Sequence, residues 1–222
     1  MSPKLVDKGK KTREIARVAL SLFSQKGYSA TSVDQIAHAA GIGKGTIYEY
    51  FKTKEDIFVA AMREWMAQFE IRLRQHLADI KHPLQRLHAI AEMNIKLVDE
   101  LDPATARLSV EFLQHSLLED GVLYKKRNLM KEMHIGQRRI VIDILLDGVS
   151  SGIFRPEIAR DAEKIAVNFL AYMDGISLHS AVSENYFDLG QQIHFYLDNL
   201  IGMIQTDGGD GGHEKTGHTV NA

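Results

Sequence analysis

The residues of clearest chemical interest lie in one short stretch, GIGKGTIYEYF, which runs from Gly41 to Phe51. Its polar side chains are an ammonium, a hydroxyl and two phenols, carried by Lys44, Thr46, Tyr48 and Tyr50. Such groups bind phosphate oxygens and the polar edges of nucleic-acid bases. The sequence shows no nucleophile paired with a general base, so we expect this stretch to bind a partner and not to catalyse a reaction.

Two short helices are predicted to position these side chains. The preceding segment, SVDQIAHAA, has apolar residues at helical spacing, and Ser32 with Gln35 fits a capping box at its start. Gly41 is expected to end this helix, because glycine adopts the left-handed conformation at little cost. A second helix is predicted from about Lys44 to Tyr50. Two small helices joined by a tight turn that contains glycine form a helix-turn-helix, here at about 32–51.

The first turn of the second helix contains Lys44, Gly45 and Thr46, and this part of a recognition helix commonly meets base edges. Gly45 lowers helix stability by about 1 kcal/mol. Close approach of its backbone to DNA would explain why glycine stands there. A nucleotide-binding loop is the alternative interpretation of GIGKGT, but the GxxxxGK[ST] spacing is absent and no predicted strand precedes it.

The charge distribution favours a polyanion as the partner of the N-terminal part. Residues 1–54 contain ten Lys or Arg and four acidic residues, a balance of +6, whereas the remainder has a balance of −8. A basic head on an acidic body suggests that only the head meets nucleic acid. A chance imbalance of surface charge is the alternative, and the charges alone do not distinguish the two.

The composition argues against several classes of protein. The 222 residues include no cysteine, which excludes disulfides and thiolate metal sites. No apolar run approaches the roughly 20 residues of a membrane span, and the charged N-terminus is not followed by the apolar segment of a signal peptide. We therefore expect a cytoplasmic protein without membrane attachment.

The rest of the sequence predicts an all-α fold. Thr12 is expected to cap a first helix that ends near Lys26, and the helix that follows the helix-turn-helix is expected to be long. Further helices are separated by glycine and proline. The predicted domains are a flexible basic arm at 1–11, a DNA-binding head at 12–54, a helical ligand-binding and dimerisation domain at 55–205, and a disordered tail at 206–222.

The segment SATSVDQIAHAAGIGKGTIYEYFKTKEDIF resembles the DNA-binding signature of the TetR (AcrR-like) family of bacterial transcriptional regulators. The resemblance is strong over 12–58, and beyond residue 60 only the number and lengths of the helices agree. It implies a three-helix head followed by a C-terminal helical bundle, about nine helices in all. It also implies a homodimer formed by the last two helices, and a small-molecule pocket in the body whose occupation moves the fourth helix.

The resemblance also implies roles for residues of the head. Phosphate contacts are implied for Thr31, Ser32, Tyr48, Lys52 and Lys54. Contacts with bases or neighbouring phosphates are implied for Lys44, Gly45, Thr46 and Tyr50. Two positions depart from the family pattern, since Gly43 stands where serine is frequent and Glu49 where histidine or another polar residue is common. One phosphate contact and the reading of bases are expected to differ accordingly.

Polar residues within apolar helical runs are candidates for a ligand pocket, because pockets place a few polar groups among apolar ones. We expect the pocket to be lined by His115, His134, Asn168 and Tyr172, with surface exposure or pairing with neighbours as the alternative for each. Glu111 and His115 also have the spacing of metal ligands, but an ion pair on the helix face or a polar pair that lines the pocket is the preferred interpretation. No metal site and no cofactor are predicted.

The last two predicted helices combine small and apolar residues, a composition suited to close packing between helices. A homodimer interface is predicted at Phe169, Met173, Ile176, Phe195, Leu197, Leu200 and Ile201. Packing of these side chains within a single chain is the alternative.

These patterns together predict a ligand-responsive transcriptional regulator without enzymatic activity, and more specifically a repressor. It is expected to bind a palindromic double-stranded DNA operator as a homodimer and to be released by a largely apolar small molecule. One alternative is a small-molecule-binding or enzymatic helical protein with a vestigial DNA-binding head. Another is a nucleoid-type DNA protein without a ligand.

Overall fold

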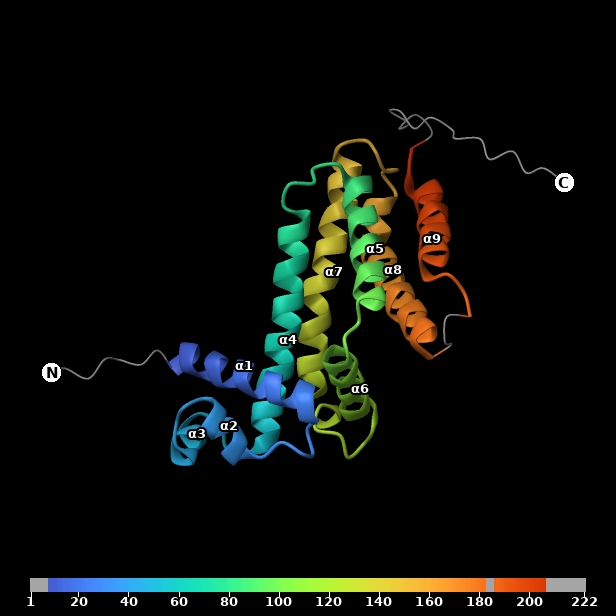
Figure 1. Ribbon diagram of the computed structural model, residues 1–222. Helices are drawn as coiled ribbons and strands as arrows, with labels where there is room; N and C mark the ends of the chain where they lie inside the picture. Colours follow the sequence, from blue (N-terminus) through green and yellow to red (C-terminus); the bar gives the residue numbers. More distant parts are fainter. Residues whose placement is uncertain (1–7, 183–185, 207–222) are drawn as a thin grey trace. The chain divides into compact units, whose positions relative to one another are not determined.

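The computed structural model describes residues 8–182 and 186–206, and within 127–134 it describes the backbone alone. Over these residues the chain forms nine α-helices and one 3₁₀ helix (Figure 1), which confirms the predicted all-α fold. The elements are α1 (Lys8–Lys26), α2 (Val33–Ala39), α3 (Lys44–Tyr50), α4 (Lys54–Leu77), α5 (Pro83–Asp99), α6 (Pro103–Leu117), the 3₁₀ helix Tyr124–Lys126, α7 (Arg127–Ser150), α8 (Ile158–Val182) and α9 (Leu189–Ile204).

The chain divides into two compact units that are not consecutive in sequence. The first unit comprises the chain up to His76 together with Leu97–Gln137, and so includes α1 to α3, most of α4, and α6. The second comprises Leu77–Lys96 and the chain from Arg138, and so includes most of α5, the later part of α7, α8 and α9. The helix-turn-helix therefore shares a compact unit with α6, which lies far from it in the sequence.

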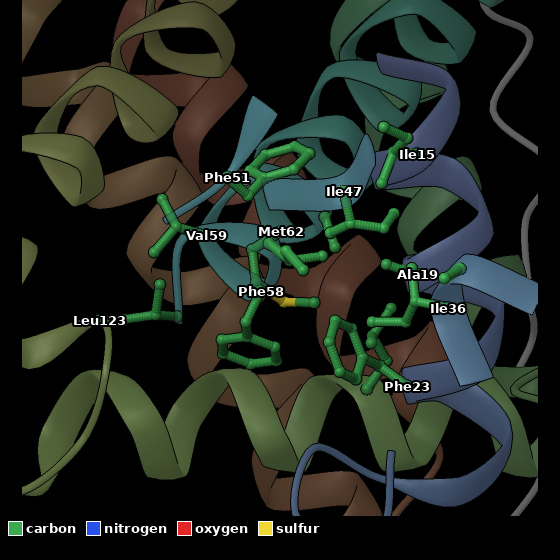
Figure 2. Close-up of a cluster of buried hydrophobic side chains, with 14 residues drawn as sticks. Ile15, Ala19, Phe23, Ile36, Ile47, Phe51, Phe58, Val59, Met62 and Leu123 are labelled. Atoms are coloured by element: carbon green, nitrogen blue, oxygen red, sulfur yellow. The ribbon is translucent and has the colours of Figure 1, made fainter. Parts of the chain in front are cut away.

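The first unit has a core in which each helix contributes one apolar face. Ile15, Ala19 and Phe23 lie four residues apart on α1, which places them on one side of the helix, and all three are buried. Figure 2 shows them with Ile36 of α2, Ile47 of α3, and Phe58 and Met62 of α4. The rings of Phe23 and Phe58 meet edge to face, with centroids 5.3 Å apart. Because helices as short as α2 and α3 are not stable alone, this core is what holds them.

Helix α6 also contributes side chains to this core. Leu108 is buried in the same cluster, and Phe112, one turn later, packs against it. The ring of Phe112 also meets that of Trp65 on α4 at a centroid distance of 5.9 Å. The head is thus packed against α6 as well as against α4.

The ends of the described chain differ from the prediction. Helix α1 begins at Lys8 and not at Thr12, and the Thr12 hydroxyl donates to the Lys8 carbonyl at 2.8 Å as part of the helix. Residues 8–11 are therefore helical, and the part of the predicted arm at 1–7 lies outside the described residues. At the other end, Thr206 donates from its hydroxyl to the Gly152 carbonyl at 3.1 Å. It belongs to the second unit, while the rest of the predicted tail, 207–222, lies outside the described residues.

The second unit is organised around α8 and α9, which pack along their lengths. Phe169 and Met173 on α8 and Ile193 and Leu197 on α9 are all buried. The turn after α7 is fixed by Phe154, whose ring lies so close to Gly148 that a Cβ there would fall 1.9 Å from Cδ2. Glycine at position 148 is therefore a packing requirement.

Candidate nucleic-acid interface

The helix-turn-helix is stabilised locally by the groups that the sequence indicated. The backbone N–H of Gln35 donates to Ser32 Oγ at 3.2 Å, and the backbone N–H of Ser32 donates to Gln35 Oε1 at 2.8 Å. This is a complete capping box at the start of α2, which confirms the prediction. Gly41 has φ +63° at the end of α2, and the next N–H, of Ile42, donates to the Ala37 carbonyl at 3.0 Å. The turn between the helices is therefore set by backbone hydrogen bonds.

Helix α3 has one face in the core and one face open. Ile47 is fully buried, whereas Tyr48 keeps 48% of its surface exposed and Lys44 is also exposed. A Cβ built on Gly45 would find no heavy atom within 4 Å among the described residues outside its own helix and chain neighbours. The outward face thus combines a cation and a phenol with a backbone that a large molecule can approach closely.

Lys44 is joined across the motif to Asp34 of α2. Its Nζ lies 2.8 Å from Asp34 Oδ2, and this hydrogen bond raises the pKa of Lys44. Both side chains are exposed, and exposed ion pairs stabilise a fold by only about 0–1 kcal/mol. A phosphate of DNA can therefore replace Asp34 as the partner at little cost to the fold.

Lys54, at the start of α4, is held against the turn that precedes α2. Its Nζ lies 4.3 Å from the centroid of the Tyr28 ring and 3.4 Å from the Ser29 carbonyl oxygen, to which it donates. Partial burial lowers the pKa of Lys54. Burial, with the carboxylate of Glu55 as the next cause, raises the pKa of Tyr28 to about 12. The ammonium of Lys54 is thus placed by an aromatic ring and a carbonyl near the start of α2.

The other predicted DNA-binding residues differ in their access to a ligand. Thr31 is 1% exposed, and its hydroxyl donates to the Gly27 carbonyl at 2.8 Å, so this side chain faces inward. Ser32 and Lys52 are exposed, although the hydroxyl of Ser32 also serves the cap of α2. Thr46 and Tyr50 are half-buried, and Tyr50 packs against the core. Apart from Thr31, the predicted residues lie at the start of α2, on α3, in the turn between α3 and α4, and at the start of α4.

Of the four residues predicted to line a pocket, the structure describes the side chains of three. His115 lies in the first unit, where its ring meets the rings of Tyr28 and Phe58, each at 4.9 Å. Asn168 is exposed on α8. Tyr172, one turn later, donates to the Gln192 carbonyl at 2.9 Å and stacks on Tyr196 with centroids 3.8 Å apart. The side chain of His134 lies outside the described residues.

The residues predicted to form a dimer interface belong largely to the core of the second unit. Phe169, Met173, Leu197 and Leu200 are buried against neighbouring helices of the same chain, and Ile176 and Ile201 are half-buried. For the four buried residues the alternative, packing within one chain, is what the structure shows. Phe195 alone points outward, at 69% exposed. Sequence reasoning missed the outward apolar residues of these helices, which are Val167, Leu178, Val182 and Met203.

The described residues contain no group of three or more His, Cys, Asp or Glu that could hold a metal ion. The pair that the sequence singled out, Glu111 and His115, is 3.6 Å apart between Oε2 and Nε2. The two side chains face each other across one helical turn, as both preferred interpretations require.

Two family profiles match the sequence. Residues 15–61 match the family described as bacterial regulatory proteins, tetR family. Residues 83–204, more than half of the chain, match the family described as BetI-type transcriptional repressor, C-terminal.

Individual relatives match over most of the chain. The HTH-type transcriptional repressor KstR2 of Mycolicibacterium smegmatis is 28% identical over 205 residues, which cover 89% of this chain and 92% of that protein. The fatty acid metabolism regulator protein of Bacillus subtilis is 28% identical over 142 residues, covering 64% and 70%. Both relatives are named as regulators.

Solved structures share the fold. A TetR-family regulator from Cytophaga hutchinsonii matches with a TM-score of 0.70 at 20% identity, covering 92% of this chain and all of that one. The regulator FadR of Bacillus subtilis, in complex with stearoyl-CoA, matches with a TM-score of 0.59 at 25% identity, covering 86% and 98%.

Proposed function

The chain belongs to the TetR family of bacterial regulatory proteins, and we propose that it is a repressor that binds a palindromic DNA operator as a homodimer and leaves it when a small molecule binds. The relatives named above are a transcriptional repressor of the helix-turn-helix type and a regulator of fatty acid metabolism. The observation that carries the proposal is the open outer face of α3, with Lys44 and Tyr48 exposed and nothing crowding Gly45. A vestigial head would not be expected to keep this face.

The proposed mode of binding places α3 in the major groove. Its first turn, with Lys44, Gly45 and Thr46, would approach base edges, while Tyr48 and the half-buried Tyr50 would lie towards the groove wall. Ser32, Lys52 and Lys54 would contact the flanking phosphates. Thr31 is proposed to act indirectly, since its hydroxyl ties the start of α2 to the Gly27 carbonyl. Residues 12–54 are accordingly proposed as the DNA-binding domain.

Two heads are needed for tight binding, because a single module buries only about 600–1,000 Å² of surface on DNA. We place the dimer contact on the outward faces of α8 and α9. Val167, Leu178 and Val182 recur along one side of α8, and Phe195 and Met203 lie on α9, all exposed. Large exposed apolar patches mark interaction sites. Of the residues predicted from the sequence, the proposed interface therefore keeps only Phe195. Its other residues lie on the exposed faces of α8 and α9, whereas most of the predicted residues lie on the buried faces.

The ligand-binding and dimerisation functions are assigned to 55–205. One relative is a regulator of fatty acid metabolism, and the Bacillus subtilis FadR structure contains stearoyl-CoA. We therefore favour a small molecule with a long apolar chain, and the first candidate is a long-chain acyl-CoA, whose CoA part is polar. Stearoyl-CoA should release the protein from its operator, with free CoA as the control. Contact of this ligand with His115, His134, Asn168 or Tyr172 stays a prediction, which neither the exposure of Asn168 nor the aromatic surroundings of His115 support.

A cytoplasmic location without membrane attachment follows from this function. By length and hydropathy α8 is a candidate span, with a mean hydropathy of 1.2 in its most apolar window. However, α8 carries the charged residue Asp174, and it buries Phe169 and Met173 in the core of the second unit. We interpret α8 as a helix of the core and of the dimer contact. The family is one of transcriptional regulators and not of enzymes.

Selection of bound DNA from a random pool tests this function directly. The proposal predicts enrichment of a palindrome with half-site centres separated by about one helical turn, 34–36 Å, or somewhat more. Recovery of sequences without a repeated half-site would contradict a dimeric operator. Uniform recovery of all DNA would instead favour the nucleoid-type alternative.

A further inference from the structure

Helix α6 contacts the turn that precedes the helix-turn-helix through one carboxylate. The backbone N–H of Tyr28 donates to Glu111 Oε2 at 3.1 Å, although the two residues are 83 positions apart. Tyr28 lies in the turn between α1 and α2, and Glu111 lies in the middle of α6. A hydrogen bond from an N–H to an ionised carboxylate is stronger than one between neutral groups. Glu111 therefore fixes the backbone at the entrance to α2.

The turn is shaped to admit this carboxylate. Gly27 has φ +84°, and a Cβ built on it would fall 2.7 Å from Glu111 Oε1. Any side chain at position 27 would be strained and would also displace Glu111. The Nη1 atom of Arg107, one turn earlier on α6, lies 4.0 Å from the same point. Glycine here serves the approach of α6 as well as the end of α1.

His115, also on α6, contacts both Glu111 and the side chain of Tyr28. Its Nε2 lies 3.6 Å from Glu111 Oε2, and its ring meets the Tyr28 and Phe58 rings edge-on at 4.9 Å. The rings of Tyr28 and Phe58 are themselves 4.8 Å apart. The Tyr28 side chain is thus confined by α4 and α6 while its backbone is tied to Glu111.

The Tyr28 ring in turn contacts the side chain of Lys54. The ammonium of Lys54 lies over this ring at 4.3 Å, and its second contact is the Ser29 carbonyl, in the same turn. A cation over an aromatic face is attracted by the electron density of the ring. Both groups that the ammonium of Lys54 contacts, the Tyr28 ring and the Ser29 carbonyl, therefore belong to the turn that Glu111 fixes. The charges of the Glu55 and Glu111 carboxylates also act on this ammonium.

From this chain of contacts we propose that Glu111 is a positioning residue for DNA binding, which acts through the Gly27–Tyr28 turn to hold Lys54 in place for a phosphate. The inference rests on the proposed DNA binding for its functional meaning. It assigns control of a phosphate contact to a side chain of α6, outside the helix-turn-helix. A displacement of α6 would then alter the contact of Lys54 directly, without requiring movement of α3.

The first test needs no DNA. Lysines of the full-length protein are converted to ¹³C-dimethyl-lysines, and the Lys54 signal is assigned with the Lys54→Arg variant. The Tyr28 ring should shift this signal upfield. Glu111→Ala should move it towards the signals of exposed lysines, whereas Glu111→Gln, whose amide oxygen can still accept the Tyr28 N–H, should keep most of the shift. Gln114→Ala, at an exposed position of α6, is the matched control. An unchanged Lys54 signal in Glu111→Ala would overturn the proposal.

The second test is a double-mutant cycle on the selected operator. Glu111→Ala should weaken binding about fivefold to tenfold in the native sequence, in the range of allosteric couplings, but less than about twofold when Lys54→Met is already present. Equal losses in both backgrounds would show that Glu111 does not act through Lys54. Should Glu111→Ala fold poorly, Tyr28→Leu can be used in its place, because it removes the ring that lies between Glu111 and Lys54. Tyr28→Leu is likewise expected to weaken binding in the native sequence but not when Lys54→Met is present. Absence of DNA binding by the native protein would refute the proposed function and leave the Lys54 signal as the decisive result.

Discussion

Arg17 of α1 donates a hydrogen bond from Nε to the carboxylate of Glu64 on α4, with 2.5 Å between Nε and Oε1. Glu64 is 8% exposed, and Gln68 donates to the same oxygen at 3.1 Å. The pair joins the first helix of the head to the long helix that follows it. Because a buried carboxylate needs hydrogen-bond partners, this contact also fixes which faces of α1 and α4 meet.

Replacement of Arg17 should therefore weaken the fold more than its exposure suggests. We expect Arg17→Met to lower the free energy of unfolding by about 1–3 kcal/mol, because Glu64 stays buried with a single neutral partner. Urea unfolding followed by circular dichroism measures this change. Arg13→Met, at an exposed position one turn earlier, is the control and should stay within about 0.5 kcal/mol of the native protein. Equal values for the two variants would refute the role assigned to the pair.

Gly45 allows stability and DNA binding to be separated. A Cβ at this position meets no described neighbour, so Gly45→Ala should raise the free energy of unfolding by up to about 1 kcal/mol. The same methyl group should weaken operator binding, because it stands where the backbone of α3 is expected to approach the bases. Thermal unfolding and fluorescence anisotropy measure the two effects. A variant that is more stable and binds equally well would show that this face does not meet DNA closely.

Lys44 and Asp34 should affect DNA binding in opposite directions. Lys44→Ala removes a cation that can bind phosphate or a base, and we expect about a tenfold loss of affinity, equivalent to 1.4 kcal/mol. Asp34→Ala removes the competing anion, so affinity should rise or stay constant. Binding isotherms at several salt concentrations measure both variants. If Asp34→Ala weakens binding as much as Lys44→Ala does, the ion pair is needed for binding and is not displaced by DNA.

The outward apolar face of α8 and α9 should carry the dimer. Phe195→Glu and Met203→Glu are expected to give monomers at micromolar concentration, because burying an unpaired carboxylate opposes association. Gln85→Glu, at an exposed position of α5 and thus outside the proposed contact, serves as the matched control. Sedimentation velocity distinguishes the species. A native protein that is already monomeric, or a dimer that survives both charges, would place the contact elsewhere.

The local parts of the fold could be predicted because their signals are local. Ser32 with Gln35 and the glycine at position 41 specify a capped helix and its end, and the structure contains both. The start of α1 was missed because Thr12 was expected to be the cap, whereas its hydroxyl donates to the Lys8 carbonyl inside the helix.

The residues that depend on tertiary contacts could not be predicted from spacing alone. Apolar stripes on α8 and α9 look alike whether they face the chain's own core or a partner, so buried residues such as Phe169 were assigned to the dimer. His115 was assigned to a pocket, since nothing in the sequence indicates that Tyr28 and Phe58 surround it. Thr31 was assigned to phosphate, because a hydroxyl beside a helix start serves a carbonyl and a phosphate equally well.

The most direct test of DNA binding through α3 is the affinity of the triple variant Lys44→Ala/Tyr48→Ala/Lys54→Ala for the selected operator, measured by fluorescence anisotropy across a salt series. If the native dimer neutralises about eight phosphates, its log–log salt slope should be about −7. The triple variant should lose at least about 100-fold in affinity and show a shallower slope, with its unfolding midpoint little changed. Native affinity and slope in the triple variant would contradict the placement of α3 on DNA.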